Sequence, residues 1–348
     1  MGTIDTRTNA FRVLIVAAAF VIVVAGMRAA ASLVVPFLLA AFIAIICAPP
    51  LLWLKSKRFP TWLALLVIIL GVACIGGLVA LVIGDSIADF RTNLPYYQTR
   101  LQGQVTAVQL WIESSLNISV STDTFGSYFD VGSIMGLVTG MLSGLGGMLT
   151  NGFMILLTVI FMLFETSAFP AKIRLAFGER IRDLSALDRF MRTVKRYMAI
   201  KSLTSLATGI MVGVWLAILG VDFPILWGLL AFLLNFVPNI GSIIAAVPAV
   251  ILALVQLGVG PCLLTALGYL VVNNVIGTII EPRFMGRGVG LSTLVVFVSL
   301  VFWGWVLGPI GMFLSVPLTM TVKIALENDA NSRWLSVLLG SDTTEKSA

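Results

Sequence analysis

Two long stretches without any charged side chain constrain the fold of this chain most. Residues 223–280 and 288–322 contain no Lys, Arg, Asp or Glu. Each stretch is longer than the ~20 apolar residues with which a helix crosses the hydrocarbon core of a membrane. The whole chain has the same character, since 59% of its residues are hydrophobic and only 11% are charged. Because helices satisfy their own backbone hydrogen bonds in lipid, the sequence predicts an all-α, polytopic membrane protein.

The two uncharged stretches share one internal pattern. In each, a Trp-Gly pair is followed by a tip with Pro and Gly and then by a Val-Pro pair. Pro lacks a backbone donor and Gly loosens a helix, so we expect each stretch to break at its tip into two half-helices. Such paired breaks are typical of the re-entrant hairpins that form a transporter's substrate site, although two tight turns between ordinary helices are an alternative. The elements of the pattern are Trp227-Gly228, 237–242 and Val247-Pro248, and then Trp303-Gly304, 308–312 and Val316-Pro317.

The remaining apolar segments predict about six spanning helices around two hairpins, in one transporter domain over 1–348. The expected spans are 12–28, 31–53, 62–84, 148–168, 203–221 and 260–280, and the hairpins are 223–258 and 290–323. Within the domain we distinguish N-terminal spans (1–84), a periplasmic helical segment (85–147), a span with a cytoplasmic helix (148–202) and a transport core (203–325).

The distribution of charge predicts the orientation. Residues 165–202 carry nine basic and four acidic side chains, whereas residues 85–131 carry two basic and five acidic ones. Basic loops stay in the cytoplasm, so we expect both termini inside and 85–131 in the periplasm. The same rule accounts for the net charge of +6 without a nucleic-acid partner.

Three regions outside the hairpins carry further information. Apolar residues recur every three or four positions over 87–112, which indicates an amphipathic helix outside the membrane that packs against other helices. A similar pattern over 173–198 predicts a basic cytoplasmic helix, which lies on the anionic leaflet or links two moving bodies. A glycine at every fourth position forms a flat stripe for close helix packing, either within the chain or between subunits. The glycines of this stripe are Gly132, Gly136, Gly140 and Gly144.

The available side chains exclude several kinds of chemistry. The chain contains no histidine, which excludes a Ser-His-Asp triad and histidine-ligated metal sites. It also lacks nucleotide-binding glycine motifs, so we expect no enzyme activity, metal or cofactor. Its three cysteines, Cys47, Cys74 and Cys262, lie in apolar runs and read as small buried hydrophobic residues.

The few polar groups in the apolar stretches are candidates for substrate binding. Amides and hydroxyls in hydrocarbon either tie helices together or bind a polar solute. Half-helix ends add free backbone groups at the two tips. The predicted substrate-binding residues are Asn235, Pro238, Asn239, Gly241, Ser242, Asn273, Asn274, Ser292, Thr293, Trp303, Pro309 and Gly311. For Trp303 a role as an interfacial anchor remains equally open.

Glu281 is the carboxylate most embedded in this part of the sequence. It follows the uncharged stretch directly and precedes Pro282 and Arg283. An acidic residue at the end of a span either binds a proton or cation or forms an ion pair. The sequence favours a pair with Arg283 or Arg287.

Long apolar motifs with fixed Gly, Pro and Trp positions give the chain a family resemblance. They occur at 238–242, 280–288, 291–296, 302–305 and 308–311, and in the Val35-Pro36-Phe37 segment. With these motifs the chain resembles the autoinducer-2 exporter family over nearly its whole length. The resemblance implies a homo-oligomer, expected to be a pentamer, in the bacterial inner membrane. It also implies hairpins that shape the substrate site and an elevator-like movement in each subunit.

The expected function is export of the quorum-sensing signal autoinducer-2, a small polyhydroxylated molecule that crosses hydrocarbon poorly. A sodium or proton antiporter that uses Glu281 is an alternative, because other family members look like such antiporters. A non-transporting membrane scaffold is a second alternative, but it leaves the paired hairpins unexplained.

Overall fold

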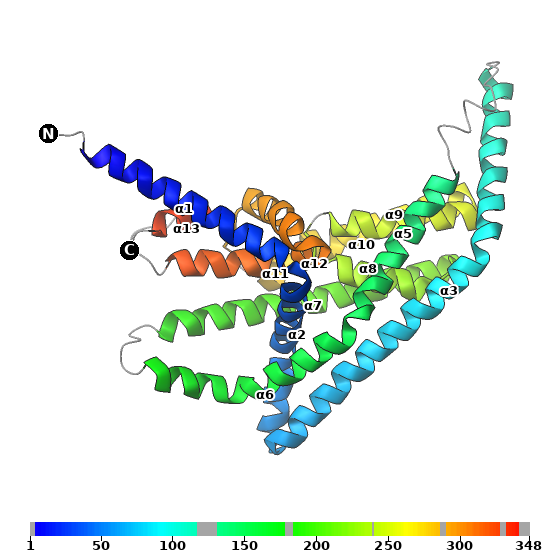
Figure 1. Ribbon diagram of the computed structural model, residues 1–348. Coiled ribbons are helices and arrows are strands. Elements are labelled where there is room, and N and C mark those ends of the chain that lie inside the picture. Colours follow the sequence, from blue (N-terminus) through cyan, green and yellow to red (C-terminus); the bar gives the residue numbers. More distant parts are fainter. Residues whose placement is uncertain are drawn as a thin grey trace. The chain divides into compact units, whose positions relative to one another are not determined.

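The structure is a computed structural model that describes residues 4–116, 131–177, 184–238, 240–285, 290–327 and 332–340. These residues are helical apart from short turns, and no strand occurs among them (Figure 1). Five of the described helices are long and apolar enough to cross a membrane. The predicted all-α, polytopic membrane fold is therefore confirmed.

The described helices follow one another along the chain. They are α1 (Ile4–Ala29), α2 (Ala31–Ser56), α3 (Thr61–Leu116), α5 (Val131–Thr150), α6 (Gly152–Phe177), α7 (Leu184–Leu219), α8 (Pro224–Leu234), α9 (Gly241–Leu257), α10 (Val259–Asn273), the π-helical turn η2 (Asn274–Ile280), α11 (Glu281–Met285), α12 (Thr293–Glu327) and α13 (Arg333–Leu338).

The chain divides into two compact units. Unit 1 comprises 1–48, 157–194 and 289–348, and unit 2 comprises 49–156 and 195–288. Helices α2, α6 and α7 contribute residues to both units. The first uncharged stretch thus belongs to unit 2, and the second belongs almost entirely to unit 1.

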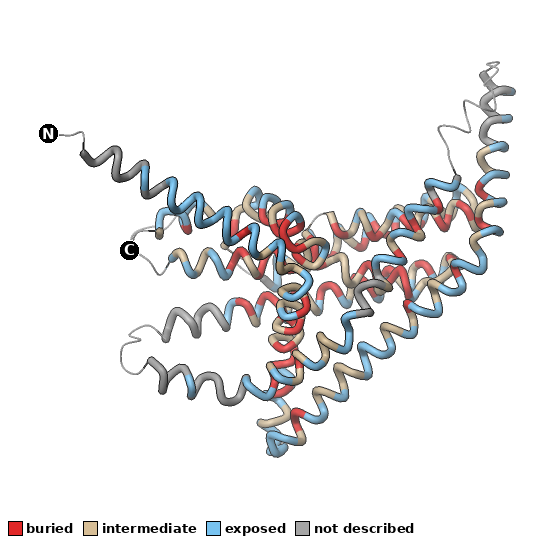
Figure 2. Tube along the Cα trace, viewed as in Figure 1, coloured by how far each residue is buried: buried red, intermediate tan, exposed pale blue. Residues whose placement is uncertain are grey.

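Unit 2 is built around one apolar core. Helix α9 packs against α8, α10 and α3, and α5 packs along α3. Trp227 on α8 is fully buried in this core, and its ring N–H donates to the carbonyl oxygen of Asp222 at 2.9 Å. Buried residues concentrate on α8 and α9, whereas exposed residues prevail along α3 (Figure 2).

Two glycines let α7 and α8 approach within backbone contact in unit 2. A Cβ added at Gly209 on α7 would lie 2.7 Å from the carbonyl oxygen of Gly228 on α8. A Cβ added at Gly228 would lie 2.6 Å from the carbonyl oxygen of Gly209. The Gly228 of the Trp-Gly pair is therefore a packing residue.

Unit 1 holds the second uncharged stretch as α12, which packs against α1 and α13. Gly308 adopts φ 71° and ψ −156° inside α12, so the helix is broken at that residue.

Two aromatic contacts also lie in unit 1. Phe42 packs edge-on against Phe313 with ring centres 4.9 Å apart. The guanidinium of Arg28 lies 4.6 Å from the ring centre of Trp305. Most described residues of α1 are exposed, as expected for a helix in contact with lipid.

Two helices run further than the sequence predicted. The predicted span 62–84 and the outer helix 87–112 form the single helix α3, which continues through Pro95. Pro95 lacks the N–H that would bond to the carbonyl of Arg91, and Arg91 is an exposed residue. The predicted cytoplasmic helix is not separate either, because α7 runs from Leu184 into the span without an intervening Gly or Pro. Residues 178–183 of that predicted helix lie outside the described residues.

Three of the four glycines of the stripe on α5 make no close contact with the described residues of the single chain. A Cβ added at Gly136, Gly140 or Gly144 would meet no atom within 4 Å. Helix α5 instead packs through the buried side chains of Met135, Val138 and Leu142. Of the two roles predicted for this stripe, close packing within the chain has no support among these three glycines.

Candidate functional site

A cavity of about 530 Å³ lies within unit 2, at the break between α8 and α9. Its volume falls in the range of cavities that hold small molecules, roughly 300–1,000 Å³. Its walls come from α7, the α8–α9 turn, α9, α10 and η2. The lining residues are Lys201, Asn235, Val237, Pro238, Ser242, Ile243, Ala246, Val250, Ala266, Tyr269, Leu270, Asn273, Asn274, Gly277, Thr278 and Glu281.

The turn at the edge of this cavity forms where the sequence predicted the first break. Helix α8 ends at Leu234, and α9 begins at Gly241. Gly241 has to be a glycine here, because a Cβ would collide with the carbonyl oxygen of Leu234. The N–H of Ile240 donates to the carbonyl oxygen of Pro238 at 2.7 Å and tightens the turn. Asn239 lies outside the described residues.

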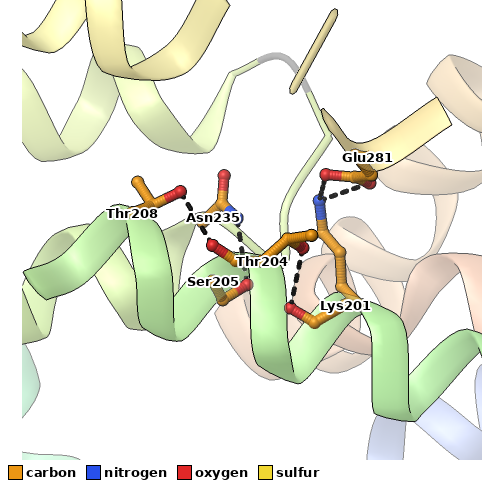
Figure 3. A network of polar contacts seen from close by, with 6 residues as sticks. All are labelled: Lys201, Thr204, Ser205, Thr208, Asn235 and Glu281. Atoms are coloured by element: carbon orange, nitrogen blue, oxygen red, sulfur yellow. Dashed lines mark hydrogen bonds and ion pairs between the residues drawn. The ribbon is translucent and has the colours of Figure 1, made fainter. Parts of the chain in front are cut away.

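Asn235 is held at the start of this turn by α7. Its amide nitrogen donates to the hydroxyl of the fully buried Ser205 at 3.0 Å. Figure 3 shows its carbonyl oxygen turned away from Ser205, and this oxygen has no hydrogen-bond partner among the described residues. Nearby hydroxyls on α7 are used within the helix, since Thr204 donates to the carbonyl of Lys201 and Thr208 donates to the carbonyl of Thr204.

Lys201 and Glu281 form an ion pair in the wall of the cavity. The Nζ of Lys201 lies 2.9 Å from both carboxylate oxygens of Glu281 (Figure 3). The two side chains are only 6% and 16% exposed. The partner of Glu281 among the described residues is therefore a residue 80 positions earlier and not Arg283, which is exposed. Arg287 lies outside the described residues.

A π-helical turn brings several lining residues to the cavity. Over Asn274–Ile280 the chain widens from α- to π-helical geometry, and the N–H of Glu281 bonds to the carbonyl of Ile276. Such turns occur mostly as single-turn insertions, often at functional sites. Asn274 donates from its amide nitrogen to the carbonyl of Leu270 at 2.8 Å. Asn273 and Thr278 line the same wall.

Tyr269 contributes a buried hydroxyl that lacks a hydrogen-bond partner. The side chain lines the cavity and is 3% exposed, and its hydroxyl oxygen has no partner in the described structure. A buried polar atom without a partner costs free energy, which an occupant of the cavity can recover.

The predicted site residues of the second stretch all belong to unit 1. Ser292 caps α12, since its hydroxyl accepts a bond from the N–H of Val295 at 3.2 Å, and Thr293 begins that helix. Trp303 is buried and donates from its ring N–H to the hydroxyl of Thr319 at 3.0 Å. A Cβ at Gly311 would collide with the carbonyl oxygen of Trp303, and Pro309 follows the break at Gly308. These contacts hold the two halves of α12 together.

Several residues singled out in the sequence line this cavity. Asn235, Pro238, Ser242, Asn273, Asn274 and Glu281 were predicted and all line the cavity. Lys201, Tyr269 and Thr278 line it too and were missed. Lys201 was counted with the basic cytoplasmic segment, although Thr204, Ser205 and Thr208 follow it as polar positions in an otherwise apolar helix.

The arrangement suits the binding of a polar solute. Amide, hydroxyl and phenol groups supply donors and acceptors, and apolar side chains such as Ile243 and Val250 shape the remaining wall. Among the described residues no cluster of acidic and cysteine side chains could hold a metal ion.

Comparisons with known proteins agree with a membrane transporter. Residues 14–330 match the model of the AI-2E family transporters. The chain is 40% identical to the AI-2 transport protein TqsA of Escherichia coli K12 over 331 residues, which cover 95% of this chain and 96% of that protein. It is 41% identical to a putative transport protein of Haemophilus influenzae, with 97% of this chain and 98% of that protein covered. The chain therefore belongs to the AI-2E transporter family.

Proposed function

We propose that this protein exports autoinducer-2 across the bacterial inner membrane. The observation that carries the proposal is the cavity in unit 2, which offers amide and hydroxyl groups at a helix break inside an apolar helical body. The 40% identity to a protein named as an AI-2 transport protein supports the choice of solute.

The chemistry of the lining fits a small polyhydroxylated solute. Moving hydroxyls from water into an apolar medium is unfavourable unless new hydrogen bonds form. The carbonyl oxygen of Asn235, the hydroxyl of Tyr269 and the amide of Asn273 can supply such bonds. The cavity thus offers the solute hydrogen bonds in place of those to water, which the hydrocarbon core of the bilayer does not supply.

Transport by alternating access requires the site to face one side of the membrane and then the other. Broken helices at the site and a body that moves past a fixed scaffold are typical of such transporters. The turn between α8 and α9 and the break at Gly308 support an elevator-like movement of the hairpins.

The proposed working form is a homo-oligomer, expected to be a pentamer, with both termini in the cytoplasm. The open space around Gly136, Gly140 and Gly144 on α5 supports subunit contact through this helix. The excess of basic residues over 165–202 supports the orientation.

Removal of one polar group from the cavity tests the proposal. Asn273→Ala should lose one or two hydrogen bonds to the solute, each worth about 0.5–1.5 kcal/mol. We expect affinity for autoinducer-2 to fall about two- to tenfold per bond, and efflux from cells to slow at equal expression. Thr106→Ala on the exposed side of α3 is the control, because its hydroxyl bonds only to the carbonyl of Gln102. Unchanged binding in Asn273→Ala together with Asn235→Ala would place the solute elsewhere.

The Lys201–Glu281 pair favours a second candidate, a sodium or proton antiporter. A carboxylate in the cavity wall can exchange its lysine partner for a cation or be protonated. Glu281→Gln should then abolish flux driven by a pH or sodium gradient in proteoliposomes. If the pair is structural, export of autoinducer-2 survives this change in correctly folded protein.

A further inference from the structure

The charges that line the cavity in unit 2 cancel one another. Lys201 and Glu281 are its only charged lining side chains among the described residues. Their contact joins one ammonium to both carboxylate oxygens at 2.9 Å, and both side chains are largely buried. The cavity therefore presents dipoles without a net charge.

A charged solute would have to disrupt this contact. An anion in the cavity would compete with Glu281 for Lys201, and a cation would compete with Lys201 for Glu281. In either case one buried charge loses its partner, which is strongly unfavourable. An uncharged solute leaves the pair intact.

The remaining polar groups of the cavity also suit an uncharged polyol. The hydroxyl of Tyr269 both donates and accepts. The carbonyl oxygen of Asn235, which has no partner among the described residues, can accept a bond from a hydroxyl donor. Asn273 and Ser242 add neutral groups of both kinds.

We infer that the Lys201–Glu281 pair makes the cavity selective for uncharged polyols and excludes their charged derivatives. The inference rests on the proposed function and specifies the form of the solute. Autoinducer-2 exists as a neutral polyol and, in the presence of borate, as an ester whose tetrahedral boron carries a negative charge. The neutral, boron-free form is the one that the cavity takes.

The inference is tested by calorimetric binding of autoinducer-2 to the purified full-length protein, in borate-free buffer and with excess borate. We expect the neutral form to bind at least about tenfold more tightly, because the ester brings an unpaired charge into the cavity. Borate alone is titrated to correct for its own binding. Equal or tighter binding of the borate ester would overturn the inference while leaving the export function in place. Binding of neither form would overturn the proposed function and the inference with it.

Variants of the pair give a second readout. Glu281→Gln leaves Lys201 as an unpaired cation, so the preference should shift by about tenfold or more toward the borate ester. The double variant Lys201→Met/Glu281→Gln is uncharged again and should keep the preference for the neutral form, even if the single variant fails to fold. Glu165→Gln removes half of the exposed Lys172–Glu165 pair and serves as the control, with no expected change. An unshifted preference in folded Glu281→Gln contradicts the inference.

Discussion

Lys201 and Glu281 lie 80 positions apart in sequence and yet form the most enclosed ion pair of the described residues. Breaking such a pair leaves one charge without a partner, whereas replacing both side chains removes the problem. We expect Lys201→Met to lower the free energy of unfolding by about 3 kcal/mol and Lys201→Met/Glu281→Gln to restore most of the loss. Unfolding in detergent, followed by circular dichroism, measures both changes.

The exposed Lys172–Glu165 pair provides the comparison for this prediction. Its side chains are 63% and 49% exposed, so solvent screens their interaction. Glu165→Gln should change the free energy of unfolding by less than about 1 kcal/mol. If Lys201→Met lowers the free energy of unfolding by no more than this, the buried ion pair does not stabilise the fold as its geometry indicates.

Replacement of Tyr269 by Phe should have opposite effects on stability and on binding. Its buried hydroxyl has no partner in the described structure, so Tyr269→Phe removes an unsatisfied group and should raise the stability of the empty protein by about 1 kcal/mol. The same change should weaken binding of autoinducer-2 about two- to tenfold, because the solute loses a hydrogen bond. Thermal unfolding with and without solute separates the two effects. Equal stability and equal affinity would mean that the hydroxyl is hydrated and not used.

At the scale of helices, the contact between α7 and α8 depends on two glycines. Gly228→Ala should lower the free energy of unfolding by about 1–3 kcal/mol, since the added Cβ would lie 2.6 Å from the carbonyl of Gly209. Gly77→Ala on α3 is the matched control, because a Cβ there meets nothing within 4 Å. The control should gain about 0.5–1 kcal/mol from its higher helix propensity. Equal effects of the two substitutions would contradict the close contact.

Helix breaks with a local chemical cause were predictable from the sequence, and those without one were not. The turn before Gly241 and the break at Gly308 follow from Pro and Gly at the tips. The π-helical turn over Asn274–Ile280 was not predicted although it contains Gly277, because a single glycine in an apolar helix does not distinguish a π-helical turn from an α-helical one. The pairing of Glu281 with Lys201 was not predicted either. The two residues are distant in sequence, and only the packing of α7 beside the cavity brings them together.

At the scale of the whole molecule, the glycine stripe on α5 leads to a prediction about assembly. Replacing Gly136 and Gly140 with Leu adds bulk where we expect two subunits to touch. Size-exclusion chromatography with light scattering should show a smaller particle whose helix content is unchanged. Gly76→Leu/Gly77→Leu adds the same bulk to another open position and should leave the particle size unaltered. An unchanged particle in the α5 variant would remove this helix from the subunit interface.

The orientation in the membrane is tested by labelling exposed positions from outside. In a variant without Cys47, Cys74 and Cys262, a cysteine at Thr106 should react with an impermeant reagent, and one at Lys57 should react only after the cells are opened. The reason is the excess of basic residues on the expected cytoplasmic side. The reverse pattern would invert the topology.

The wide turn after Asn273 has a consequence for how this site can change during evolution. A π-helical turn holds an extra residue compared with the α-helix around it. The wider turn takes up this extra residue, so deletion of one residue within 274–280 would restore α-helical geometry and leave the following side chains in register. The same deletion in a helix without such a turn would rotate them by about 100° around the axis. This segment can therefore change its length by one residue in evolution while the carboxylate of Glu281 still faces Lys201.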